Sequence, residues 1–153
     1  MTIFLIRHAH AGKRSEWTAD DRLRPLSKRG AEQAERLTTV VGDLVVGRIL
    51  SSPYVRCMQT IEPLAEKFEI EIQSSEVFAE GADADAAYQA LLELDAFDGV
   101  ACSHGDLIPR LLRRLVADGM DTDGPLIDQK GSMWIIEMRN SRPFMGRYVP
   151  PTA

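Results

Sequence analysis

The sequence has few cysteines and no long hydrophobic segment. Its two cysteines, Cys57 and Cys102, are too few for a disulfide framework, and both lie in apolar stretches, so we expect reduced thiols. No apolar run approaches the roughly 20 residues that a membrane-spanning helix needs. The chain enters an apolar strand pattern at once, without a basic lead or a cleavage site. The sequence therefore predicts a cytoplasmic protein with no membrane partner.

An excess of positive charge is also missing. The chain has 18 basic and 23 acidic residues and a net charge of −5. A nucleic-acid-binding domain requires a basic face, so we expect no nucleic-acid partner. The basic residues nevertheless crowd one segment: Lys13, Arg14, Arg22, Arg24, Lys28 and Arg29. This cluster predicts either a solvated, salt-bridged loop or a positive rim that attracts an anion.

What the chain does have is the composition of an ordinary globular protein. Its 153 residues are 44% hydrophobic and 27% charged. A chain of this length buries about 68–70% of its unfolded surface. We therefore expect one domain over residues 1–153.

Short apolar strands alternate with amphipathic helical patterns. Residues 3–6, 48–51 and 99–103 read as strands buried on both faces. Residues 70–72 with 77–78 suggest an interrupted edge strand, and residues 132–138 and 144–149 suggest an antiparallel hairpin. Because the crossovers are long enough to be helical, the pattern predicts a three-layer α/β/α sandwich. Its sheet is expected to be mostly parallel, with an antiparallel C-terminal edge.

Each expected helix has a candidate first residue. Ser27 suits a helix N-cap, Ser52 a second cap with Pro53 at the first helical position, and Asp83 or Asp85 a third. Asp106 is the expected cap of the fourth helix, in which Pro109 falls in the first turn. The apolar stripe of the first helix is Ala31, Ala34, Leu37, Val40, Val41 and Leu44. The expected buried face of the second helix is Val55, Met58, Ile61, Leu64, Ala65 and Phe68, with Pro63 inside it as a kink or a lost hydrogen bond.

The three histidines of the chain follow predicted strands. Arg7 and His8 end the first strand, with His10 two residues further, and His104 ends the strand 99–103. Ligands of open α/β sheets bind beyond the carboxyl ends of the strands. Arg56 falls in the first turn of a helix, where free N–H groups already favour an anion. This combination predicts a shared site that binds and transfers a phosphoryl group.

Several other chemistries do not fit. His8 and His10 match the metal-binding pair of amidohydrolases, but that barrel needs about 250 residues and further ligands, so we expect no metal. A cysteine phosphatase needs arginine six residues after its cysteine, where this chain has Pro63 and Ile108. Residues 42–47 have Walker-type glycine spacing but precede a strand and lack the Lys-Ser/Thr pair. The dinucleotide glycine fingerprint is absent, and no cofactor is expected.

The motifs together resemble the histidine phosphatase superfamily, which includes phosphoglycerate mutases. They are Leu5-Ile6-Arg7-His8-Ala9, Ser51-Ser52-Pro53 with Arg56 and Thr60, and Ser103-His104-Gly105. Arg24-Pro25-Leu26-Ser27 followed by Gly30 is similar to the small SixA-type phosphohistidine phosphatases. The region 130–132 is also similar to phosphatase-like domains fused behind Nudix domains in some actinobacterial nucleotide-cleaning enzymes. The sequence departs from the superfamily at Ala9, where glycine is usual.

The resemblance implies a mechanism. His8 attacks phosphorus and forms a phosphohistidine, which water hydrolyses. Arg7, Arg56 and His104 bind the phosphoryl oxygens, and Arg24 is an additional phosphate contact. His104 would act as a protonated donor, so a carboxylate is expected near it. The proton donor expected after residues 77–79 is Glu80, with Glu76 as its competitor.

The predicted function is therefore a metal-independent phosphatase. Its expected substrate is a phosphohistidine protein or a phosphorylated small molecule. Two alternatives remain open at this point: a nucleotide di- or triphosphate hydrolase of the same superfamily, and a phosphate-binding module with little turnover. The roles of His10 and Trp17 are also open.

Overall fold

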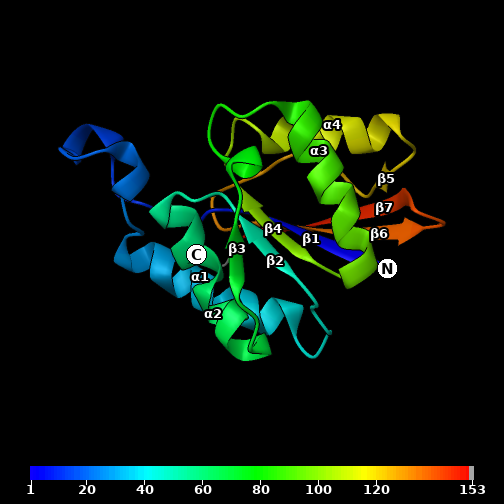
Figure 1. Ribbon diagram of the computed structural model, residues 1–153, viewed down its shortest axis with the longest axis horizontal. Coiled ribbons are helices and arrows are strands. Elements are labelled where there is room, and N and C mark those ends of the chain that lie inside the picture. The colour runs from blue at the N-terminus through cyan, green and yellow to red at the C-terminus, as the bar shows by residue number, and fades with distance from the viewer. Residues whose placement is uncertain (152–153) are drawn as a thin grey trace.

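The computed structural model, described here for residues 1–151, places a seven-stranded sheet between two pairs of helices (Figure 1). The strands lie in the order β3-β2-β4-β1-β6-β7-β5. They are β1 Thr2–Arg7, β2 Ile49–Ser51, β3 Ile72–Ser74, β4 Val100–Ser103, β5 Asp121–Thr122, β6 Met133–Arg139 and β7 Arg142–Val149. β3, β2, β4 and β1 run parallel, and β6 pairs antiparallel with both β1 and β7. The predicted three-layer α/β sandwich with an antiparallel edge is confirmed.

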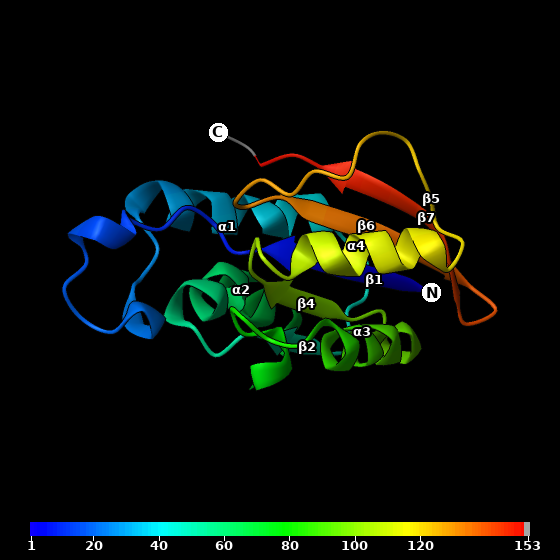
Figure 2. The same cartoon turned by 90° about the horizontal axis from the view of Figure 1, so that it is seen from above.

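The helices cover both faces of this sheet. α1 Lys28–Val41 and α2 Val55–Phe68 lie on one face, and α3 Ala84–Glu93 and α4 Ile108–Ala117 lie on the other, as Figures 1 and 2 show. The side chains of β1 contribute to two hydrophobic cores, one on each face of the sheet, because successive side chains of a strand point to opposite faces. Ile3 and Leu5 pack with residues of α3 and α4, whereas Phe4 and Ile6 pack with residues of α1 and α2.

The α1 prediction is confirmed at its start and wrong at its end. Ser27 is the N-cap, and its hydroxyl oxygen accepts a hydrogen bond from Gly30 N–H. The helix ends at Val41, so Leu44 lies beyond it and is 52% exposed. Ala31 is also exposed. The buried face of α1 instead includes Gly30 and Gln33, because the side of the helix nearest His10 is packed against backbone.

The predicted start of α2 is wrong. The helix begins at Val55 with Tyr54 as N-cap, and Ser52 lies outside it. The buried face of α2 is shifted toward polar residues: Arg56, Cys57, Thr60, Ile61, Leu64 and Ala65. Val55 and Met58 are only partly buried. The apolar periodicity could not predict this face, because the part of α2 near the strand ends buries polar side chains. The helix continues through Pro63 to Phe68.

Two smaller expectations are corrected. Residues 77–78 lie in a short 3₁₀ turn, Glu76–Phe78, whereas the edge strand β3 is limited to Ile72–Ser74. Asp106 does not cap α4: the N-cap is Leu107, and the Asp106 carboxylate accepts a hydrogen bond from Gly81 N–H at 2.7 Å. The expected cap of α3 is confirmed, because Asp83 accepts from Asp85 N–H. None of the helices in residues 1–151 has the length and apolar character required to cross a bilayer.

Candidate active site

The carboxyl ends of three adjacent parallel strands define the site. β4 lies between β1 and β2, with Arg7 in register with Ser103 and Ser51 in register with Cys102. The next residue of each chain segment therefore projects from the same edge of the sheet: His8, Ser52 and His104. The rings of His8 and His104 stand edge to face with their centroids 5.3 Å apart. The structure thus brings together two imidazoles that are far apart in the sequence.

The His8 ring is held in one tautomer by its neighbour. Its Nδ1 lies 2.9 Å from the carbonyl oxygen of Ala9, which only accepts, so Nδ1 carries the proton and Nε2 has a free lone pair. Burial lowers the pKa of His8 to about 3, with His104, Arg56 and Arg7 adding to the effect against the Ala9 hydrogen bond. His8 is therefore neutral at neutral pH, as a nitrogen nucleophile must be.

Arg7 is fixed from two sides. Its Nη1 donates to the backbone oxygen of Asp128 at 2.7 Å, and the Asp128 carboxylate lies 3.8 Å away. Burial raises the pKa of the Asp128 carboxyl, which Arg7 opposes. On the other side, the guanidinium lies so close to Gly105 that a Cβ there would meet Arg7 Cζ at 2.6 Å. Glycine at position 105 therefore makes room for Arg7.

Arg56 is buried, at 1% exposure, and does not behave as a surface arginine. Its Nη1 donates to the backbone oxygen of Asp21 at 2.9 Å, and its Nη2 lies 3.1 Å from the Asp21 carboxylate. The guanidinium also lies over the ring of Tyr54, 4.8 Å from its centroid. An arginine in the first turn of α2 is thus compensated by a carboxylate from another segment.

His104 is oriented by a hydroxyl, a cysteine sulfur and an aromatic ring. Its Nε2 lies 2.8 Å from the hydroxyl of Ser52 and 3.5 Å from the sulfur of Cys57, and its ring stands edge to face with Tyr54. Within residues 1–151 no carboxylate hydrogen-bonds to this ring, in contrast to our expectation. The surroundings of Cys57 are likewise less apolar than the sequence suggested. Both cysteines are free and buried.

Three nitrogen atoms of these residues share an unusual property. Nε of Arg7, Nε of Arg56 and Nδ1 of His104 are buried and have no hydrogen-bond partner in residues 1–151. Buried polar atoms without a partner are rare, because each costs about 1–3 kcal/mol. Here they belong to residues that line one cavity with His8. The arrangement is suited to an anionic ligand that accepts several hydrogen bonds.

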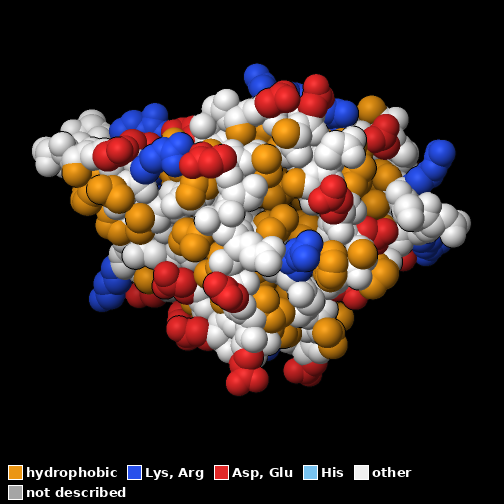
Figure 3. All heavy atoms as spheres, in the orientation of Figure 1, with side chains coloured by type: hydrophobic (Ala, Val, Ile, Leu, Met, Phe, Trp, Pro, Cys, Tyr) orange, Lys and Arg blue, Asp and Glu red, His pale blue; other side chains and the backbone are white. Residues whose placement is uncertain are grey.

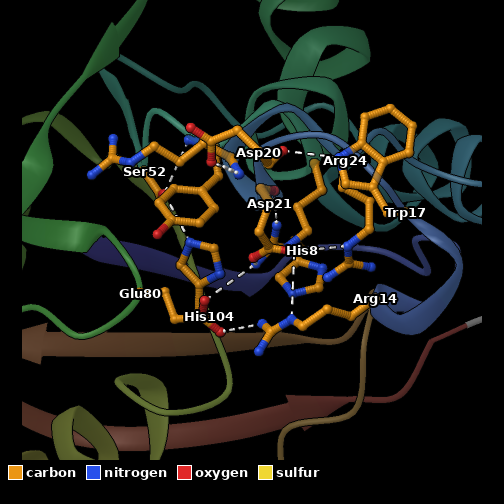
Figure 4. Close-up of polar contacts among 12 residues, drawn as sticks. His8, Arg14, Trp17, Asp20, Asp21, Arg24, Ser52, Glu80 and His104 are labelled. Atoms are coloured by element: carbon orange, nitrogen blue, oxygen red, sulfur yellow. Dashed lines mark hydrogen bonds and ion pairs between the residues drawn. The ribbon is translucent and has the colours of Figure 1, made fainter.

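The two candidate proton donors lie in different places. The Glu80 carboxylate is part of the cavity wall, 2.8 Å from Nη2 of Arg14 and 3.6 Å from Nη2 of Arg56 (Figure 4). Glu76 lies outside the cavity lining and is paired with Arg22 through both of its oxygens, at 2.9 and 3.0 Å. Its side chain is 67% exposed. Of these two candidates, Glu80 alone lines the cavity that contains His8.

The basic segment forms an extension over this edge of the sheet. Residues 12–25 contain two short 3₁₀ turns, Arg14–Glu16 and Asp21–Leu23, and project from the body in both ribbon views (Figures 1 and 2). Basic and acidic side chains alternate on this projection (Figure 3). Arg24 is buried and lines the cavity, but its Nε donates to Asp21 at 3.0 Å and its Nη1 to Gly12 O. The salt-bridged loop is confirmed for Arg14, Arg22 and Arg24. Of the predicted positive rim, Lys13, Arg14 and Arg24 line the cavity, whereas Arg22, Lys28 and Arg29 lie outside its lining.

Sequence reasoning missed the importance of Asp21. Its carboxylate contacts Arg14, Arg24 and Arg56 together, and Figure 4 shows it among these contacts. The available signal was an acidic residue three positions before Arg24, on a segment expected to cross the crevice. The contacts of Arg7 with Asp128 and of His104 with Ser52 were also missed. Each of them joins segments that are distant in the sequence.

His10 and Trp17 have different positions. The Nδ1 of His10 lies 2.7 Å from the hydroxyl of Ser27, and the ring lines the cavity. Trp17 is 36% exposed and its Nε1 donates to Asp20 O at 2.9 Å. It lines a neighbouring hollow with Pro25 and Leu26 and does not line the cavity of His8.

The cavity has a volume of about 440 Å³. It is lined by Arg7, His8, His10, Ala11, Gly12, Lys13, Arg14, Arg24, Arg56, Glu80, His104, Gly105, Asp106 and Lys130. Within the described residues, no group of three or more His, Cys, Asp and Glu side chains is arranged to hold a metal ion. Positive side chains dominate the lining, which favours a phosphate or another anion.

Comparisons with known proteins identify the family of the chain. The family profile of the histidine phosphatase superfamily (branch 1) matches residues 3–94. An 8-oxo-(d)GTP phosphatase of Mycolicibacterium smegmatis is 34% identical over 155 residues, covering 98% of this chain but 48% of the relative. The chain thus spans about half the length of that relative.

Solved structures show the same fold. The protein histidine phosphatase SixA in complex with tungstate has a TM-score of 0.77 at 19% identity, covering 100% of this chain and 97% of the other. The mycobacterial glucosyl-3-phosphoglycerate phosphatase with VO3 has a TM-score of 0.69 at 16% identity, covering 99% of both chains. The solved structures share the fold, and the matched profile, which spans more than half of the chain, shows that the chain belongs to the histidine phosphatase superfamily.

Proposed function

We propose that the protein hydrolyses phosphate compounds through a phosphohistidine intermediate on His8, without a metal. The observation that carries this proposal is the set of three unpartnered buried nitrogens, on Arg7, Arg56 and His104, around a neutral imidazole whose Nε2 is free within residues 1–151. A phosphoryl group has three equatorial oxygens that take on charge during transfer, and these donors match that requirement.

The reaction then has two steps. Nε2 of His8 attacks phosphorus, the bond from phosphorus to the leaving atom breaks, and Glu80 donates a proton to that atom, which is oxygen in a phosphate ester and nitrogen in a phosphohistidine. In the second step Glu80 takes a proton from water, the oxygen of which attacks phosphorus and breaks the P–N bond. Inorganic phosphate leaves and His8 returns to its neutral form. Arg24, which lines the same cavity, is a further substrate contact.

The substrate is proposed to be a phosphorylated small molecule or a phosphohistidine protein. Both carry the phosphoryl group that the cavity side chains would bind, and the fold is shared with SixA. A second candidate, hydrolysis of a nucleotide di- or triphosphate, is favoured by the relative named 8-oxo-(d)GTP phosphatase.

The test is to trap the intermediate. Purified protein with a chelator present would be incubated with ³²P-labelled phosphohistidine, sugar phosphates and nucleotides and then quenched in alkali. We expect turnover with the chelator and an alkali-stable, acid-labile label on His8. His8→Ala should lose both the label and the turnover, whereas His10→Ala should still be labelled. Phosphate binding with no turnover on any substrate would instead indicate a phosphate-binding module.

A further inference from the structure

The cations of the cavity fall into two groups that differ in their partners. Each of the four arginines faces a carboxylate: Arg7 with Asp128, Arg14 with Glu80, and Arg24 and Arg56 with Asp21. Lys13 and Lys130 line the same cavity, and neither has a carboxylate within ion-pairing distance in residues 1–151. The two lysines are therefore the cations that the protein's own carboxylates leave uncompensated.

Lys130 is held near the reacting group by its backbone. The next residue, Gly131, donates its N–H to the carbonyl oxygens of Arg7 and His8, at 3.2 and 3.0 Å. Gly131 has a φ of +82°, and a Cβ there would lie 2.9 Å from Gln33 Oε1. Both the positive φ and the close approach of Gln33 favour glycine at this position. Lys130 thus projects from a turn fastened to the end of β1, and it cannot drift away from His8 as a lysine on a loose loop could.

The electrostatic surroundings of Lys130 are unfavourable without a ligand. Burial lowers the pKa of Lys130, and Arg7, Arg24, Arg56 and Arg14 lower it further. The carboxylates that face the four guanidiniums therefore leave some repulsion of Lys130, and an anion bound beside the lysine would offset it. The transferred phosphoryl group already has its own donors on Arg7, Arg56 and His104. The lysines are consequently available for a different group of the substrate.

We infer that Lys130 and Lys13 form a second anion subsite, which binds the phosphate next to the one transferred to His8. This inference rests on the proposed function and narrows its substrate to a phosphoanhydride, such as a nucleoside di- or triphosphate. The ammonium group is a compact phosphate binder with three donors. The terminal phosphoryl group would pass to Nε2 of His8. The bridging P–O bond breaks, and the electron pair stays on the phosphate held by the lysines.

The test compares binding of orthophosphate with binding of pyrophosphate by calorimetry, with a chelator present. We expect wild-type protein to bind pyrophosphate at least about tenfold more tightly than orthophosphate. Lys130→Gln and Lys13→Gln should each reduce this ratio about five- to tenfold. Lys130→Arg, which keeps the charge, should largely keep the ratio. Lys28→Gln, an exposed lysine of α1 outside the cavity lining, is the matched control and should leave it unchanged.

A parallel assay would measure kcat/KM for GTP and for p-nitrophenyl phosphate. Lys130→Gln should lower the value for GTP more than that for the monoester. Equal affinities of the wild type for the two anions, or a ratio that neither glutamine variant reduces, would overturn the subsite. Absence of turnover on every substrate would overturn the proposed function alone, because the binding ratio is measured without catalysis.

Discussion

The carboxylate of Asp21 lies 3.1 Å from Nη2 of Arg56, a side chain that is 1% exposed. The same carboxylate lies 3.0 Å from Nε of Arg24 and 3.4 Å from Nε of Arg14. Burial alone would raise the pKa of Asp21, but the three arginines outweigh it and lower that pKa. One carboxylate of the protein therefore offsets part of the positive charge of three arginines that line the cavity.

We expect the Asp21 carboxylate and a bound phosphate to compete for the same arginines, and replacing Asp21 with asparagine tests this competition. We expect Asp21→Asn to destabilise the protein by about 1–3 kcal/mol, because the buried Arg56 loses a charged acceptor. Added phosphate should restore more stability to the variant than to the wild type, since the ligand supplies the missing negative charge. Thermal unfolding with and without phosphate measures both effects. Asp20→Asn, next in the chain, is the control, and equal shifts in all three proteins would contradict the competition.

Gly105→Ala should displace Arg7 without disturbing the fold. The added Cβ would meet the end of a flexible side chain, which can move at low cost, but the guanidinium would leave its position beside the phosphoryl site. Because hydrogen bonds to charged groups are worth about 1.5–3 kcal/mol, we expect phosphate binding to weaken roughly 10- to 100-fold. Calorimetric titration with phosphate measures the loss. At Gly124 an added Cβ has no neighbour within 4 Å, so Gly124→Ala should bind phosphate normally.

The loss of kcat caused by Glu80→Gln should depend on the leaving group of the substrate. Loss of a general acid costs on the order of 10²–10⁴ in rate when the leaving oxygen must be protonated. We therefore expect this loss of kcat with an alkyl phosphate and a much smaller one with p-nitrophenyl phosphate. Glu76→Gln, which removes a carboxylate paired with Arg22 outside the cavity lining, should retain the wild-type preference. If Glu76→Gln reproduced the effect, the proton donor would be misassigned.

The buried His8 should make the protein sensitive to acid. Its pKa in the folded protein, about 3, lies below its ordinary value of 6.5. The unfolded chain therefore binds a proton that the folded protein excludes, and stability is lost as the pH falls from 6.5 toward 3. Unfolding free energies of the wild type and His8→Asn, measured between pH 4 and 6.5, should show a shallower slope for the variant. Identical slopes would mean that His8 titrates normally in the folded state.

The sequence by itself determined the layers of the fold and the histidines that meet at the strand ends. Apolar runs predicted β1, β2 and β4, and their order along the chain placed His8 and His104 at the same edge of a parallel sheet. These features follow from local periodicity and from the rule that parallel strands end together. The residues Arg7, His8, Arg56 and His104 could therefore be selected before their distances were known.

Only the tertiary structure decided which charges meet. Glu76 and Glu80 are the same residue type on one short stretch, yet one pairs with Arg22 on the surface and the other lines the cavity. The pairing of Asp21 with Arg56 spans 35 residues, and that of Arg7 with Asp128 spans 121. Side-chain contacts of this kind depend on the path of irregular loops and on burial, which carry no periodic signal in the sequence.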